Sequence, residues 1–252
     1  MNMSSILKTR EYINLSYQQI SESDLSKLEK IIQRLSSQNE LTIDVFQNKI
    51  GSKGLKIISD GISNSQNMIK LFLYLKENNI SDIGIQSLSQ ALIRLQTLCF
   101  FSLNLSNNQI TNSGMASLSE AISQCPNLQS FTLSLRQNNI SQEGIEYLSE
   151  GITKAKKLQQ LQLLLGNNPI KNKEASTLIQ AINLNPQIYC FTIMLDKTQV
   201  NQFGALEIVS LLSKSNNLSS FNLYLTMNNV VRQSKFQYCK KLSRIVKFSI
   251  RV

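Results

Sequence analysis

From residue 11 onward the sequence repeats itself every thirty residues, and this period constrains the fold more than any other feature. Eight units follow one another in register, and they start at residues 11, 41, 71, 101, 131, 161, 191 and 221. A fixed period of this length is typical of a solenoid, in which each unit packs against its two neighbours. We therefore expect a single elongated domain over residues 11–250, with residues 1–10 as an N-terminal extension and the first and last units as caps.

Each unit opens with an alternating pattern that predicts a β-strand. When the unit is numbered from 1 to 30, positions 1, 3 and 5 are apolar almost throughout, as in Phe131, Leu133 and Leu135. Such alternation is typical of a strand with one buried face. An asparagine recurs at position 8 in six units, just after the strand. This placement predicts a ladder of amide side chains that pair with backbone groups of the loop.

The second half of each unit has the spacing of an amphipathic helix. In the third unit Ile85, Leu88 and Leu92 recur at helical intervals. Helix-capping residue types stand at position 11 in five units, namely Ser21, Ser81, Thr111, Ser141 and Asn201. Glycines recur at position 14 in five of the eight units, where we expect a tight turn or close packing against the neighbouring unit. A phosphate-binding loop is not predicted, because these glycines never cluster.

The repeat carries a family resemblance that covers nearly the whole chain, and one unit shows it clearly. The pattern Leu128-x-x-Phe131-x-Leu133-x-Leu135-x-x-Asn138-x-Ile140 resembles leucine-rich repeats of the ribonuclease-inhibitor type, and its longer strand is similar to the arrays abundant in ciliated protists. The resemblance implies an α/β fold, a leucine-rich-repeat solenoid forming a curved horseshoe segment of about eight 30-residue repeats. Parallel strands would line its concave face and helices its convex face. Such repeats serve many partners, so the resemblance implies binding without naming what is bound.

The composition argues against catalysis. No histidine occurs among the 252 residues, which excludes mechanisms that need a histidine base and removes the commonest zinc ligand. The spacing of the cysteines matches neither a zinc knuckle nor a disulfide framework; they are Cys99, Cys125, Cys190 and Cys239. We predict a protein that is not an enzyme, has reduced thiols, and takes no cofactor, metal or small-molecule substrate.

The sequence predicts neither membrane insertion nor secretion. No stretch approaches the roughly 18–20 apolar residues that span a bilayer, and the first ten residues lack the apolar run of a secretory signal. We expect an intracellular, cytoplasmic protein with no membrane partner. Lys8 and Arg10, with no acidic residue before Glu11, make a mitochondrial presequence the weaker alternative.

Positions 2 and 4 of each strand are expected to face the open, concave side. This face is nearly uncharged, and Asp44 is its one acidic residue. Five of its side chains are large and apolar: Phe72, Tyr74, Leu164, Met194 and Tyr224. Aromatic and methionine side chains on a rigid neutral surface suit protein recognition, whereas strand propensity alone is the competing explanation. We predict that the five bind a partner.

Residues 231–252 form a basic C-terminal cap, with seven cationic residues and no acidic one in a chain of net charge +10. Lys240, Lys241, Arg244 and Lys247 are expected to share one side of a helix, and 248–252 to form a final edge strand. Such a patch attracts polyanions. We expect this segment to contact the acidic surface of another protein, with RNA as the weaker alternative. The competing explanation is that the basic residues bind no partner and only keep this end of the chain solvated.

Three functions follow from these features. The first is a non-catalytic protein–protein interaction scaffold, a structural subunit of a larger assembly, with ciliary or cytoskeletal hosts suggested by the protist resemblance. The second is a basic structural component of a ribonucleoprotein. The third is a regulator of an enzyme such as a small GTPase, for which no motif is present. A ribonuclease-inhibiting role is disfavoured, because capture of a basic enzyme needs an acidic inner face.

Overall fold

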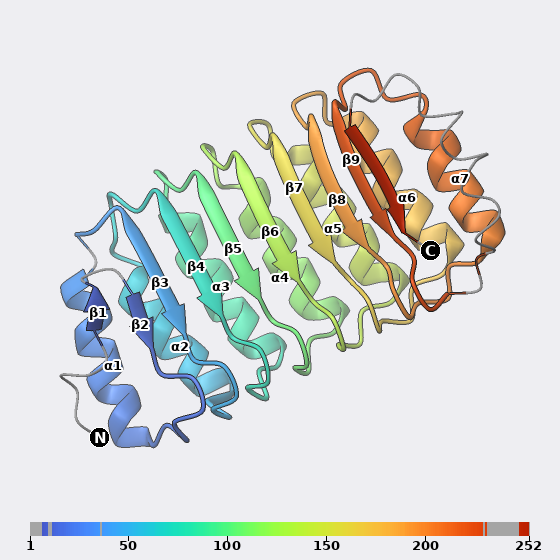
Figure 1. Ribbon diagram of the computed structural model, residues 1–252. Coiled ribbons are helices and arrows are strands. Elements are labelled where there is room, and N and C mark those ends of the chain that lie inside the picture. Colours follow the sequence, from blue (N-terminus) through green and yellow to red (C-terminus); the bar gives the residue numbers. More distant parts are fainter. Residues whose placement is uncertain (1–6, 10–11, 36, 229, 231–246, 252) are drawn as a thin grey trace.

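The computed structural model describes residues 7–9, 12–35, 37–228, 230 and 247–251 (Figure 1). Its strands lie side by side in one sheet, in chain order from β1 to β10. The strands are β1 (Leu7–Thr9), β2 (Tyr12–Asn14), β3 (Glu40–Asp44), β4 (Lys70–Tyr74), β5 (Phe100–Asn104), β6 (Ser130–Ser134), β7 (Gln160–Leu164), β8 (Cys190–Met194), β9 (Ser220–Tyr224) and β10 (Lys247–Arg251). The helices of the described chain are α1 (Glu22–Leu35), α2 (Gly51–Ile62), α3 (Asp82–Arg94), α4 (Asn112–Ser123), α5 (Gln142–Lys154), α6 (Asn172–Leu184) and α7 (Gln202–Leu212).

Strands β2 to β9 are parallel and pair residues that stand thirty apart, as in Leu73 opposite Leu103 and Leu103 opposite Leu133. Parallel strands need a crossover connection, and each unit supplies it with its helix. In the seven units that start at residues 11 to 191, the repeat therefore translates into one strand and one helix per unit, as the sequence predicts.

The core lies between the sheet and the helices. Positions 1, 3 and 5 of the strands are buried, as in Phe131, Leu133 and Leu135, and so are the helix residues Ile145 and Leu148 behind them. Neighbouring position-1 rings also stack inside the array, since the ring centroids of Phe101 and Phe131 are 5.5 Å apart. Each unit buries its apolar side chains against the next, so the core runs the length of the sheet.

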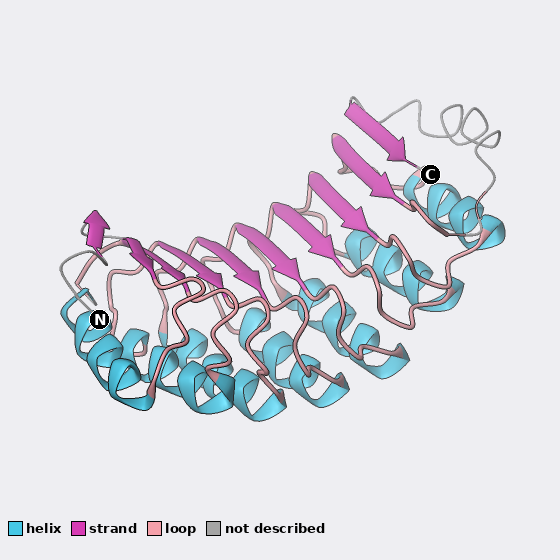
Figure 2. Ribbon diagram, turned by 60° about the horizontal axis from the view of Figure 1, so that its bottom comes forward, coloured by secondary structure: helices cyan, strands magenta, loops and turns pink. Residues whose placement is uncertain are grey.

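The array is curved, with the strands on its inner side and the helices on its outer side (Figure 2). Neighbouring strands are about 4.8 Å apart, whereas packed helices need about 8–10 Å between their axes. The helical layer is therefore longer than the strand layer, and the sheet must take the concave side. The predicted leucine-rich-repeat solenoid is confirmed.

Both ends of the sheet depart from the repeat. At the start, β1 pairs with β2 antiparallel, so part of the N-terminal extension covers that edge of the sheet. At the other end β10 pairs with β9 in parallel, with Phe248 opposite Phe221, which confirms the predicted final strand. Lys247 begins β10, so the expectation that it shares a helix with the other cap lysines was wrong. The alternation of Phe248 and Ile250 has a period of two and favours a strand.

The predicted asparagine ladder is present. Nδ2 of Asn138 donates to the carbonyl oxygens of Leu105 and Leu135, at 2.9 and 3.1 Å, and Oδ1 accepts from the backbone N–H of Ile110 at 3.0 Å. One side chain thus satisfies backbone groups of two successive units. These bonds fix the loop where each strand ends, next to the concave face.

The helix starts follow the prediction only in part. The side chains of Thr111 and Asn201 cap their helices, but those of Ser81 and Ser141 make no such bond. Ser141 instead pairs with Asn112 of the preceding unit, whose Nδ2 lies 2.8 Å from the serine Oγ. The capping residues therefore also join neighbouring units.

The position-14 glycines pack closely rather than turn. A Cβ on Gly144 would lie 2.7 Å from Oδ1 of Asn112 in the preceding unit. Of the two roles expected for these glycines, close approach between units is the one that applies here.

Candidate binding surface

Strands β3 to β9 begin one residue earlier than the apolar pattern indicates. Strand β4 starts at Lys70 and β5 at Phe100, each at position 30 of the preceding unit. Because side chains alternate along a strand, position 30 shares the concave face with positions 2 and 4. This adds Phe100, which is 39% exposed, to the surface predicted from the sequence. The alternation of the strand would have predicted this position, because Phe100 stands two residues before Ser102 and so lies on the same face.

Three aromatic side chains gather near the N-terminal part of the concave face, and we name Phe72, Tyr74 and Phe100 the aromatic area. In the register of β4 and β5, Lys70 lies opposite Phe100 and Phe72 opposite Ser102, so the two phenylalanines are diagonal neighbours. Tyr74 is 37% exposed and Phe72 is half-buried.

A depression of about 370 Å³ opens beside the aromatic area. Phe72 and Phe100 line it together with Ser102, Ser130 and Thr132. The short hydroxyl side chains of β5 and β6 leave room that larger residues would fill. The result is an apolar wall beside hydrogen-bonding groups.

The other predicted residues form a separate set, and we name Leu164, Met194 and Tyr224 the apolar row. They lie directly opposite one another on β7, β8 and β9. In the same register, Asn104 and Ser134 separate this row from Tyr74. The five predicted residues therefore lie in two groups, with polar residues of β5 and β6 between them.

One face of the Tyr224 ring is occupied. Tyr224 pairs in register with Arg251 of β10, and the guanidinium carbon lies 5.3 Å from the ring centroid. This distance is typical of a cation–π contact. The apolar row thus ends at a cation, which the sequence pattern of a single unit does not reveal.

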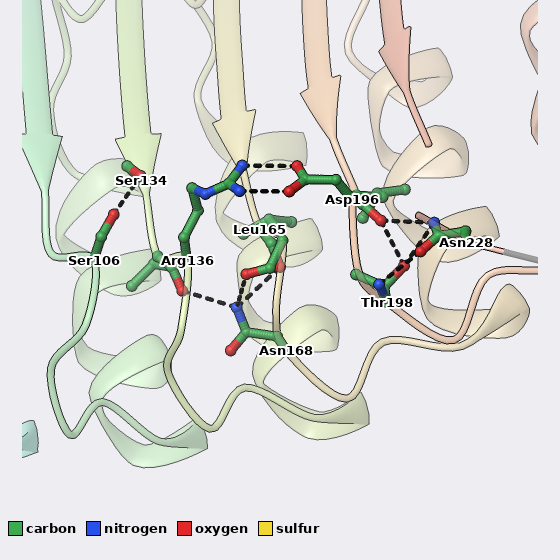
Figure 3. Close-up of polar contacts among 11 residues, drawn as sticks. Ser106, Ser134, Arg136, Leu165, Asn168, Asp196, Thr198 and Asn228 are labelled. Carbon is green, nitrogen blue, oxygen red and sulfur yellow. Dashed lines mark hydrogen bonds and ion pairs between the residues drawn. The ribbon is translucent and has the colours of Figure 1, made fainter. Parts of the chain in front are cut away.

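An ion pair spans three units where the strands end (Figure 3). Nη1 of Arg136 lies 2.7 Å from Oδ1 of Asp196, and Nη2 bonds the second carboxylate oxygen. Arg136 follows β6 and Asp196 follows β8, so the pair passes over the unit between them. Gly166 stands at the equivalent position of that unit, where a Cβ would lie 2.9 Å from the Asp196 carboxylate. The glycine makes room for the pair.

Other charges on this side of the molecule are also paired. The ammonium of Lys70 lies 2.9 Å from a carboxylate oxygen of Glu40, and that of Lys76 lies 4.9 Å from the ring centroid of Phe46. Asp44 was expected to be the one acidic residue on the face, but the longer strands and their ends add Glu40 and Asp196. Because these carboxylates pair with cations, they add little net charge.

The predicted cap site lies mostly outside the described residues. Lys240, Lys241 and Arg244 fall in the segment 231–246, and the backbone of Lys247 belongs to β10. The side chains of all four therefore lie outside what the structure describes, and their role stays a prediction.

One repeat unit matches a known family model. Residues 102–119, which run from β5 into α4, match the family model described as Leucine Rich repeat. The same succession of strand, loop and helix recurs from β2–α1 to β8–α7. The fold of the chain is that of a leucine-rich-repeat solenoid.

Solved structures similar to this chain include two internalins from Listeria monocytogenes. Internalin C2 is 18% identical with a TM-score of 0.45, and the match covers 88% of this chain and 83% of that one. A second internalin, inlF, is 16% identical with a TM-score of 0.31, and the match covers 94% of this chain and 86% of that one. No curated protein matches the sequence.

The described residues were compared with the groups that metal binding and thiol chemistry require. No group of three or more His, Cys, Asp or Glu residues is placed there to hold a metal ion. Cys99, Cys125 and Cys190 are free thiols, and burial raises the pKa of Cys125 to about 12. Among the described helices, none has the length and apolar character needed to cross a bilayer.

Proposed function

We propose that this leucine-rich repeat protein is a non-catalytic scaffold that binds another protein through its concave face. The observation that carries the proposal is the depression beside Phe72 and Phe100, with the hydroxyl groups of Ser102, Ser130 and Thr132 on its other side. Leucine-rich repeats typically bind other proteins, which supports the general class of function.

The physical basis is apolar area held on a rigid frame. Phe100 and Tyr74 remain more than one third exposed, and burying such rings under a partner is favourable by about 25 cal/mol per Å² of apolar area. Their strands are paired on both sides and backed by the buried core. Little conformational entropy is then lost on binding, which favours affinity.

The depression suits an apolar side chain of the partner. Phe72 and Phe100 would contact that side chain, while the hydroxyls of Ser102, Ser130 and Thr132 would bond polar groups of the partner's backbone. Such a combination of aromatic contacts and satisfied polar groups is typical of the centre of a protein interface.

The test is a double variant, Phe72→Ser with Phe100→Ser, used to recover partners from the native cell by cross-linking and affinity purification. We expect recovery of the specific partner to fall at least about tenfold, since aromatic residues at interface centres contribute about 2 kcal/mol or more each. Phe203→Ser is the matched control, because Phe203 is 77% exposed on α7 of the convex side. Unchanged recovery with the double variant would show that the aromatic area does not bind the partner.

The apolar row is a second contact in the same proposal. A variant with Leu164→Ser and Tyr224→Ser tests the contribution of the apolar row separately from that of the aromatic area. If the partner spans the whole concave face, both double variants recover less of it. If only the apolar row binds, the variant with Phe72→Ser and Phe100→Ser still recovers the partner.

The identity of the host assembly and the role of the basic segment belong to this proposal as well. We propose an acidic protein surface as the contact of residues 231–252, with RNA as the alternative, and a ciliary or cytoskeletal complex as the host. The support is the run of cations in the sequence. Replacing Lys240, Lys241 and Arg244 with Ala and measuring binding to RNA and to acidic peptides against salt concentration distinguishes the two.

A further inference from the structure

The aromatic area continues into a longer line of rings across the concave face. On β4, Phe72 and Tyr74 stand two residues apart and therefore share this face. Asp44 of β3 lies opposite Tyr74 in the register of the sheet. Phe46 stands two residues after Asp44 and is half-buried, so it is the next diagonal neighbour of Tyr74. The two chains are still paired here, because the N–H of Val45 donates to the carbonyl oxygen of Tyr74 at 3.1 Å.

A fifth ring ends the line, in the loop after β2. Tyr17 is 63% exposed, and its ring meets that of Phe46 edge to face with centroids 4.8 Å apart. The ammonium of Lys76 also lies 4.9 Å from the Phe46 centroid, so two neighbours fix this ring. The line begins at Phe100, which is the diagonal neighbour of Phe72. We name Phe100, Phe72, Tyr74, Phe46 and Tyr17 the aromatic stripe.

The spacing along the aromatic stripe matches an extended peptide. Diagonal neighbours in a sheet are about 7–8 Å apart, and residues two apart on one strand are separated by about 6.6 Å. Alternate side chains of an extended chain have nearly the same separation, about 6.6–6.8 Å. The apolar row differs, because Leu164 and Met194 lie directly opposite each other, about 4.8 Å apart. The stripe is roughly 25 Å long, the length of about eight extended residues.

Short polar side chains flank the aromatic stripe on both sides. Thr42 of β3 and Ser102 of β5 lie opposite Phe72. Asp44 and Asn104 take the same places beside Tyr74. A peptide that lies along the rings would therefore find hydrogen-bonding partners for its backbone N–H and C=O groups, which need them once they leave water.

The charges beside the aromatic stripe balance one another. The described ones are Lys49, Lys70, Lys76, Glu40, Asp44 and Glu77, which are three cations and three anions in a chain of net charge +10. Lys70 lies 2.9 Å from Glu40, and Lys76 lies 3.1 Å from Glu77. A polyanion such as RNA binds through an excess of cations, and these residues provide none. An uncharged occupant therefore fits this part of the face best.

We propose that the aromatic stripe binds an extended, uncharged segment of a protein partner, with an apolar side chain at every second position. Each such side chain contacts one ring, and the backbone between them bonds the flanking polar groups. The inference rests on the proposed function, since it names the chemistry of what the concave face binds. It also extends the binding surface beyond the aromatic area to Phe46 and Tyr17.

The experiment is a selection of peptides on the full chain, from a phage-displayed library of random twelve-residue sequences. We expect the enriched sequences to carry apolar residues at alternate positions over about eight residues, with few charged residues among them. The selection needs no knowledge of the natural partner, and the enriched peptides then serve as probes in fluorescence anisotropy.

Variants at the two ends of the aromatic stripe test where the peptide lies. Phe100→Ser changes one end and Tyr17→Asn the other, and asparagine tolerates the φ of 61° at this position. We expect each to weaken binding about tenfold, as loss of an interface aromatic does. Removing residues from one end of the peptide is expected to abolish the effect of one of these variants and to keep that of the other.

Leu164→Ser is the matched control, because Leu164 is half-buried on the same concave face but lies on β7, off the aromatic stripe. This variant is expected to bind the peptides as the wild type does. Circular dichroism checks that each variant is folded.

Several results would overturn the inference. They are a selection without a shared pattern, apolar residues at helical spacing, and peptides that bind both end variants fully. Binding of a uridine oligonucleotide or of arrayed glycans, or a dimer of the chain, that the end variants abolish would show a different occupant. If the variant with Phe72→Ser and Phe100→Ser loses the cellular partner while the selection yields no such peptide, the proposed function stands and this inference fails.

Discussion

Asn138 connects two units with one side chain, and this is the residue-scale basis of the array. Its amide bonds carbonyl groups of Leu105 and Leu135 and the N–H of Ile110. The loop that follows each strand also places position 7 in the left-handed region, as in Gln137 at φ 54°. Backbone of this shape leaves polar groups unpaired, and the recurring asparagine satisfies them.

We predict that Asn138→Ala lowers the free energy of unfolding by roughly 3 kcal/mol, because it leaves several backbone groups without a partner. Asn139→Ala is the matched control, since Asn139 is exposed in the same loop and surface changes usually stay within about 0.5 kcal/mol. Chemical denaturation followed by circular dichroism measures both. Equal effects of the two substitutions would contradict the role of the ladder.

Cys125 yields a prediction about pH. Burial raises its pKa from the ordinary 9.0 to about 12 in the folded state. The folded state therefore holds the thiol proton more tightly than the unfolded chain does. The stability that this contributes is fully present below pH 9, and it is lost as pH rises through the range up to about 12.

The corresponding measurement is alkylation of Cys125 by iodoacetamide at pH 8, followed by site-resolved mass spectrometry. We expect a rate about a thousandfold lower in the folded protein than in the urea-unfolded chain, because the thiolate fraction falls tenfold per unit of pKa. Similar rates in the two states would show that the thiol is not buried.

At the scale of elements, the loop after β7 depends on a glycine that the repeat does not require. Gly166 lies beneath the ion pair of Arg136 and Asp196, and a Cβ there would approach Asp196 to 2.7 Å at its carbonyl oxygen. The pair joins the ends of β6 and β8. It therefore limits movement of three successive units relative to one another.

We predict that Gly166→Ala destabilises the fold by about 1–3 kcal/mol, since the added methyl group overpacks this loop. Thr226→Ala places alanine at the equivalent position after β9, where the residue is exposed, and is expected to change the free energy by less than about 0.5 kcal/mol. Thermal unfolding of both variants provides the comparison. A Gly166→Ala variant as stable as the wild type would mean that the loop can shift without cost.

The elements show which parts of the fold can be predicted from the sequence. Strands and helices were predictable, because the alternating and helical spacings recur in every unit. Phe100 was missed because the apolar pattern marks buried positions, and the first residue of each strand faces outward. The pair of Arg136 and Asp196 was missed for another reason: it skips a unit, and the thirty-residue period indicates contacts only between adjacent units.

At the scale of the whole molecule, curvature follows from the repeat, but the binding surfaces do not. The concave position of Leu164, Met194 and Tyr224 could be predicted, whereas the cover of Arg251 on Tyr224 depends on how the chain returns after the last unit. Binding surfaces depend on residues that differ from one unit to the next. The thirty-residue period predicts only the residues that the units have in common.

The central claim is that a protein partner lies on the concave face beside the aromatic area. The most direct measurement is photo-cross-linking in the native cell, with p-benzoylphenylalanine placed at Thr132 of β6, which lines the depression. The control position is Gln86 on α3, which is exposed on the helical side. We predict a discrete cross-linked partner from Thr132 and none of the same mass from Gln86. A partner captured from Gln86 and not from Thr132 would contradict the account.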